Sequence, residues 1–182
     1  MGELQRGEFS FNGTPMRQSF GISIAKVHDV LLPALRARKI GIPQTDGRYD
    51  YGAKNWEERP LILECNIAKK PSRAEMRELA YVLSKKGKIV LWNEPDKYYI
   101  GRLYDPQVLT KIGRGQLEFT LEFVCEPFAV GKTITQPLQS GNNPIEYKGT
   151  AETPCLIVLK NTGENEVQTI QIKAVYRRKG GM

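Results

Sequence analysis

The chain has few of the side chains that build catalytic and metal sites. Among its 182 residues it has one histidine, His28, and three cysteines, Cys65, Cys125 and Cys155. Without a second histidine or a closely spaced pair of cysteines, the sequence lacks the usual ligand sets of zinc. Cys65 and Cys125 each fall on the apolar face of an expected strand, where a free thiol serves as a small buried hydrophobe. We therefore expect a protein that is not an enzyme and needs no metal or other cofactor.

Long apolar segments are also lacking. No stretch approaches the roughly 18 apolar residues of a membrane-spanning helix, and residues 1–18 contain no apolar core of a secretory signal. Unpaired cysteines are typical of proteins made in a reducing cytoplasm. Because 40% of the residues are hydrophobic, the chain can nevertheless bury a core. The sequence thus predicts a folded protein that is made in a reducing cytoplasm and has no membrane association.

Positive charge is in excess. The chain has 27 lysines and arginines against 20 aspartates and glutamates, a formal net charge of +7. A basic surface attracts either nucleic acid or an acidic protein partner. Acidic residues are interspersed among the basic clusters, as is typical of a solvated face. A basic nucleic-acid-binding module therefore stays an alternative to a surface that meets another protein.

Residues 116–125 alternate without interruption between apolar and polar side chains, which is the pattern of a half-buried strand. Residues 60–67 alternate in the same way, and residues 88–103 predict a tight hairpin that turns at residues 93–96. Asn12-Gly13 predicts a second, two-residue hairpin turn, because both residues tolerate positive φ. The fold class that follows is α+β and mainly β. The apolar face of the longest strand consists of Leu117, Phe119, Leu121, Phe123 and Cys125.

One amphipathic helix is expected after residue 72. Ser72 and Glu75 form the Ser-x-x-Glu capping box, and Gly87 is the expected stop. The apolar stripe at helical spacing is Met76, Leu79, Ala80 and Leu83. We expect this stripe to cover the apolar face of residues 116–125. The opposite face of that strand, with Glu118 and Glu122, is then left to meet solvent, a neighbour or a channel.

A long protruding hairpin, or arm, is expected between about residues 36 and 58. Asp46-Gly47 is its turn signal, and aromatic side chains alternate with charged and small ones on its second strand. Exposed aromatics on such an arm are typical of binding surfaces, although they could also fold back onto the sheet of their own domain. The candidate subunit-interface residues are Arg38, Tyr49, Tyr51 and Trp56.

The character of the sequence changes after Phe128. A segment rich in glycine, proline, serine, threonine and asparagine indicates a linker. Three short strand-like segments follow, which are too few for an independent core. We therefore expect a first domain over residues 1–137 and a partial β domain over residues 138–182.

The order of these elements resembles the distal tail protein (Dit) family of long-tailed bacteriophages with non-contractile tails. The motifs that carry the resemblance are the Glu94-Pro95 turn, the run Tyr98–Arg102 and the close Phe123–Phe128. The resemblance covers residues 1–137. It implies a β-sandwich-like N-terminal domain with one helix, and a galectin-like or carbohydrate-module-like second domain, whose start residues 138–182 resemble.

The resemblance also implies a structural role in a phage or prophage virion. Six copies would form a ring, the hub of a baseplate at the distal end of the tail. The partners implied are the tail tube protein, the tail-tip protein and the receptor-binding apparatus, and DNA would pass through the channel without specific binding. Synthesis would take place in the bacterial host cytoplasm. A carbohydrate-binding module remains a further alternative, with Tyr147 and Tyr176 as its possible sugar platform.

Overall fold

The computed structural model describes residues 4–52, 55–68, 71–105, 108, 110–112, 116–151, 153–173 and 175. The chain divides into two compact units, Met1–Tyr147 and Lys148–Met182, which we describe separately. None of the helices in the described ranges has the length and apolar character needed to cross a membrane.

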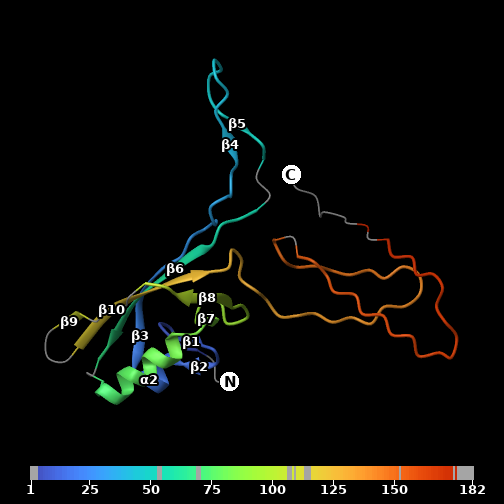
Figure 1. Ribbon diagram of the computed structural model, residues 1–182. Coiled ribbons are helices and arrows are strands. Elements are labelled where there is room, and N and C mark those ends of the chain that lie inside the picture. The colour runs from blue at the N-terminus through green and yellow to red at the C-terminus, as the bar shows by residue number, and fades with distance from the viewer. Residues whose placement is uncertain are drawn as a thin grey trace. The chain divides into compact units, whose positions relative to one another are not determined.

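An antiparallel sheet forms the body of the first unit (Figure 1). Its strands follow the order β2-β1-β7-β8-β10-β6-β3, and β9 pairs with β10 beside them. The strands are β1 (Phe9–Phe11), β2 (Thr14–Pro15), β3 (Ile22–His28), β6 (Arg59–Ile67), β7 (Gly87–Leu91), β8 (Tyr99–Leu103), β9 (Thr110–Ile112) and β10 (Gln116–Cys125). Two further strands, β4 (Lys39–Ile40) and β5 (Tyr49–Asp50), make a separate two-stranded sheet. The predicted mainly β, α+β fold class is confirmed.

The long pairing of β10 with β6 is the spine of this sheet. It runs in unbroken antiparallel register from Leu117 opposite Ile67 to Cys125 opposite Arg59. The five apolar side chains of β10 that were predicted to share a face are each at most 6% exposed. Strict alternation on both strands therefore gives one buried face and one outer face, as the period of two predicted.

The sheet curls so that its two ends meet. The backbone N–H of Ile24 on β3 donates to the carbonyl of Gly7, just before β1, at 2.8 Å. Across the interior, the rings of Phe11 and Phe123 stack with centroids 5.7 Å apart. The core therefore lies inside one continuous sheet that wraps on itself.

Two tight turns occur where the sequence predicted them. Asn12 and Gly13 have φ values of 50° and 82°, and they join Phe11 to its partner Thr14. This is the geometry in which both central residues of a hairpin turn have positive φ. The β7–β8 hairpin is also confirmed, with Ile89 opposite Tyr99.

The capped helix α2 (Arg73–Leu83) begins as predicted. Ser72 Oγ accepts a hydrogen bond from the Glu75 backbone N–H at 3.2 Å, and the Glu75 carboxylate accepts one from the Ser72 N–H at 2.6 Å. The predicted stripe is partly wrong. Leu79 and Leu83 are buried in the core with Val82 packed beside them, whereas Met76 is half-buried and Ala80 is exposed. Only the C-terminal half of the helix therefore reaches the core.

Two details of the helical prediction need correction. Gly87 does not stop α2, which ends at Leu83; instead it begins β7, where the Asn12 side chain occupies the space that a Cβ would fill. A second, short helix, α1 (Met16–Phe20), lies between β2 and β3. Gly21 ends it with a left-handed φ of 68°.

The second unit has no regular secondary structure in its described residues. The strands predicted between residues 145 and 176 are not formed there, and Leu156 and Val158 are 89% and 76% exposed. Apolar side chains that have no second layer to pack against cannot hold short strands together. Tyr147 is exposed and Tyr176 lies outside the described residues, so the proposed sugar platform is not tested. The partial β domain and the division at residue 137 stay predictions.

Replacing Gly101 by valine should destabilise the first unit. A Cβ at Gly101 would lie 2.5 Å from Cys125 Sγ and 3.1 Å from the Val124 carbonyl oxygen. Overpacking of this kind costs about 1–3 kcal/mol. Thermal denaturation should show a lower Tm for Gly101→Val than for Gly131→Ala, since a Cβ at Gly131 meets open space. Equal Tm values for the two variants would contradict the packing described.

Thiol reactivity should separate the three cysteines. Burial raises the pKa of Cys65 and of Cys125 to about 12, whereas Cys155 is exposed. At pH 8 a disulfide reagent should therefore modify one thiol quickly and the other two only after denaturation. A Cys155→Ser variant should lose the fast phase. A fast phase that persists in this variant would show that a core thiol is accessible.

Candidate subunit interface

The arm is formed by residues 34–57 and contains β4 and β5 (Figure 1). Its root is fastened by backbone hydrogen bonds from Arg36 N–H to the Asn55 carbonyl at 2.9 Å and from Glu57 N–H to the Ala34 carbonyl at 2.8 Å. The Arg36 guanidinium also donates to both carboxylate oxygens of Glu57, at 2.7 and 3.1 Å. These hydrogen bonds lower the pKa of Glu57. The predicted protruding hairpin therefore exists as a defined two-stranded element.

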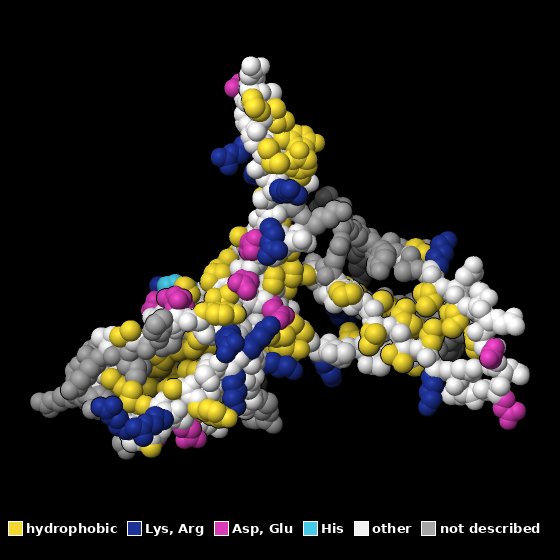
Figure 2. Space-filling model, viewed as in Figure 1, with side chains coloured by type: hydrophobic (Ala, Val, Ile, Leu, Met, Phe, Trp, Pro, Cys, Tyr) yellow, Lys and Arg dark blue, Asp and Glu magenta, His cyan; other side chains and the backbone are white. Residues whose placement is uncertain are grey.

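One side of the arm presents an apolar and aromatic surface, which we call the arm face. Ile40 lies opposite Tyr49, and the Tyr51 N–H donates to the Arg38 carbonyl one step further along the ladder. Residues opposite each other or two apart share a side of a strand pair. The arm face consists of Arg38, Ile40, Ile42, Tyr49 and Tyr51. Figure 2 shows hydrophobic side chains gathered along the upper part of the arm.

The two tyrosines of the arm face are open to solvent. Tyr49 is 56% and Tyr51 is 63% exposed, and their rings meet edge to face with centroids 4.9 Å apart. Ile40 and Ile42 are 44% and 48% exposed beside them. A contiguous exposed group of large apolar side chains is the usual mark of an interaction surface.

Trp56 was predicted to share this exposed surface and does not. It is half-buried at the root of the arm, where its ring meets that of Phe128 edge to face with centroids 5.8 Å apart. The alternative that aromatic residues fold back onto their own domain therefore holds for Trp56. The other three candidates, Arg38, Tyr49 and Tyr51, are brought together on the arm face.

Arg59, which was not among the residues predicted from the sequence, anchors the chain that leads into the arm. Its side chain is nearly buried, and its Nη2 donates to the carbonyls of Val30 and Leu31. The guanidinium lies 5.6 Å from the ring centroid of Tyr99, whose pKa is raised to about 12, chiefly by burial. Its position in the sequence was the signal. The side chains of β6 are buried at alternate positions, and Arg59 holds one of these positions where the others are apolar.

A groove on the outer face of the sheet carries acidic side chains; we call it the outer groove. It has a volume of about 730 Å³, and its lining includes Ala25, Glu64, Val108, Glu118, Thr120 and Glu122. Thr120 on β10 lies opposite Glu64 on β6. Glu64 Oε1 lies 2.5 Å from Nε2 of His28, and this hydrogen bond lowers the pKa of Glu64. The outer face of β10 is thus acidic in the structure as in the sequence.

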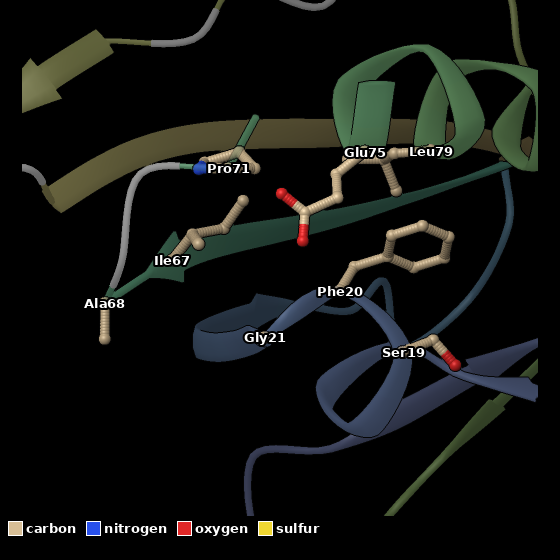
Figure 3. A pocket seen from close by; sticks show the side chains of 8 residues that line it. All are labelled: Ser19, Phe20, Gly21, Ile67, Ala68, Pro71, Glu75 and Leu79. Carbon is tan, nitrogen blue, oxygen red and sulfur yellow. The ribbon is translucent and has the colours of Figure 1, made fainter. Parts of the chain in front are cut away.

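A second, smaller pocket lies between α1, the end of β6 and α2 (Figure 3). Its volume is about 280 Å³, and Phe20, Ile67 and Leu79 supply most of its apolar lining. The carboxylate of Glu75 points into it, but this group is already held by the helix cap. In the described part of the chain no cluster of histidine, cysteine, aspartate or glutamate is arranged to hold a metal ion.

Comparison with known proteins places this fold. The family model described as phage tail protein RIFT-related domain matches residues 12–125. The structure is similar to the crystal structure of the Dit protein of bacteriophage SPP1, described as a paradigm of the hub adsorption apparatus in phages that infect Gram-positive bacteria. The TM-score is 0.56 and the identity is 19%, with 69% of this chain and 52% of that chain covered. No curated protein matches this chain.

These matches differ in what they show. At 19% identity the likeness to the SPP1 protein shows the fold, and this chain spans about half the length of that protein. The family model covers most of the chain and includes the turn, the arm, the capped helix and the β6–β10 spine. The resemblance predicted from the sequence is confirmed, and the chain belongs to the family of phage tail proteins that carry the RIFT-related domain.

Proposed function

We propose that this protein is a structural hub at the distal end of a phage tail. In this proposal several copies, six in the arrangement that the family resemblance implies, close into a ring. The ring joins the tail tube to the tail-tip and receptor-binding proteins and lets DNA pass through its channel. The protein would accordingly reside in the virion tail. Membership of the phage tail family and the fold shared with a hub protein support this role.

The observation that carries the proposal is the arm. A two-stranded element is only marginally stable alone. Among the described residues, no second layer covers Tyr49 and Tyr51. A neighbouring copy that covers the arm face would bury this apolar surface. Because the arm differs from the body that receives it, the contact is head-to-tail, and such contacts close into rings when the rotation permits.

Other features of the chain favour a structural role in an assembly over a role in catalysis or in nucleic-acid binding. The buried thiols Cys65 and Cys125 have pKa values raised to about 12 and are therefore poor nucleophiles. The outer groove is acidic, which disfavours tight binding of nucleic acid. A structural hub is therefore the one function that we propose.

The arm tyrosines should be required for assembly. In a Tyr49→Ala/Tyr51→Ala variant, the concentration at which half the chains are assembled should rise at least tenfold, because truncating aromatic hot spots costs about 2 kcal/mol or more. Sedimentation velocity and native mass spectrometry measure this shift. Tyr81→Ala on α2 is the matched control, since Tyr81 is 65% exposed but lies off the arm. Unchanged assembly in the double variant would contradict the proposal.

Arg59 should hold the arm root even in the monomer. In Arg59→Met the carbonyls of Val30 and Leu31 lose their donor, at a cost of about 1–3 kcal/mol. Hydrogen exchange should therefore accelerate in residues 29–57 while β10 stays protected. Arg102→Met is the control, because Arg102 also donates to a backbone carbonyl, that of Ser84, but away from the arm. Equal exchange in both variants would rule out the anchoring role.

A further inference from the structure

We propose that the outer groove is the acceptor site for the arm face of a second copy of this chain. The inference deepens the proposed function and rests on it, because it names the surface with which the arm would close a ring.

The groove has an acidic rim around apolar side chains. Glu118 and Glu122 project from the outer face of β10, and Glu64 joins them from β6 across the register pair with Thr120. Val108, 73% exposed, lies among these carboxylates. Within the described residues, Glu118 and Glu122 have no ion-pair partner. Such a surface suits an occupant that brings apolar area together with a cation.

The groove also coincides with an interruption in strand pairing. β10 pairs with β8 over residues 123–125 and with β9 over residues 116–118. Between these stretches, the described pairing of residues 119–122 is with β6 alone. The groove therefore lies beside the stretch of β10 for which the described residues show no pairing with β8 or β9.

The arm face is complementary to the groove in composition. Its two tyrosines and two isoleucines supply apolar area, and Arg38 adds a guanidinium on the same side. Arg38 is exposed and has no carboxylate partner among the described residues. Arginine and tyrosine are, with tryptophan, the side chains enriched at the centres of protein interfaces. Pairs of opposite charge across an interface also fix its register.

The arm of one chain does not fill the groove of the same chain. It leaves the sheet at Arg59, where β6 begins, whereas Glu64 lies midway along that strand. Figure 1 shows the arm projecting beyond this end of the sheet. An extended chain rises about 3.3 Å per residue, so residues 36–46 can reach up to about 33 Å. Neighbouring strands are only about 5 Å apart, so the arm is long enough to extend to another copy. The occupant is therefore the arm of another copy.

Charge reversal tests the pairing. Arg38→Glu and Glu122→Arg should each raise the half-assembly concentration at least tenfold, and the double variant Arg38→Glu/Glu122→Arg should recover most of the loss. Lys39→Glu is the matched control for the arm, because Lys39 is the adjacent exposed cation on the opposite side of the hairpin. Glu78→Arg on α2 is the control for the groove. Absence of rescue, or equal effects of variants and controls, would overturn the proposal.

Photocrosslinking supplies a readout that does not require a stable ring. A benzophenone amino acid placed at Tyr51 of the full chain should form intermolecular adducts, with mass spectrometry locating them on Ala25, Glu64 or residues 118–122. Adducts elsewhere on a protein that still forms rings would overturn the groove and leave the hub standing. Neither rings nor adducts at high protein concentration would overturn both. Charge-reversed groove variants could also assemble normally but bind DNA. This result would overturn the acceptor site and identify the groove as part of the channel lining.

Discussion

The structure depends on one interaction, the antiparallel pairing of β6 with β10. Nine residue pairs in unbroken register give these two strands a shared inner face and a shared outer face. β3 extends the sheet on one side, and β8 and β9 extend it on the other. A slip of one residue would turn Phe119, Phe123 and their neighbours out to solvent, so the burial of the inner face fixes the register of the whole sheet.

The same pairing positions the surfaces that we assign to assembly. β6 begins at Arg59, whose guanidinium holds the chain that enters the arm. β10 carries Glu118 and Glu122 on its outer face, where the outer groove lies. The two strands thus connect the element that would reach a neighbour to the surface that would receive a neighbour. A rigid spine between donor and acceptor is what a head-to-tail ring needs, because small errors in rotation prevent closure.

Short sequence motifs predicted those elements whose backbone geometry depends on neighbouring residues alone. Asn12-Gly13, the Ser72–Glu75 box and the alternation of residues 116–125 each specify a backbone geometry by themselves. The arm and its exposed tyrosines were also predictable, because a turn signal lies between two polar-rich strands. By contrast, helical spacing gave equal weight to Ala80 and Leu83, whereas in the structure Leu83 is buried and Ala80 is exposed.

Features that depend on distant residues were not predictable. Trp56 meets Phe128 across a long stretch of sequence. Arg59 is tolerated inside because the carbonyls of Val30 and Leu31 accept its hydrogen bonds and Asp29 lies within ion-pair distance. The short helix α1 is too brief to show a helical period, although Gly21 supplies its stop. The strand-like segments after residue 145 show the converse: a period of two does not make a sheet when no layer covers it.

Assembly of this chain through its arm can be observed by electron cryo-microscopy of the full chain at high protein concentration. We expect closed rings in which each arm lies against the outer face of β6 and β10 of the next copy. Particles that remain monomeric, or rings whose arms project freely into solvent, would contradict it.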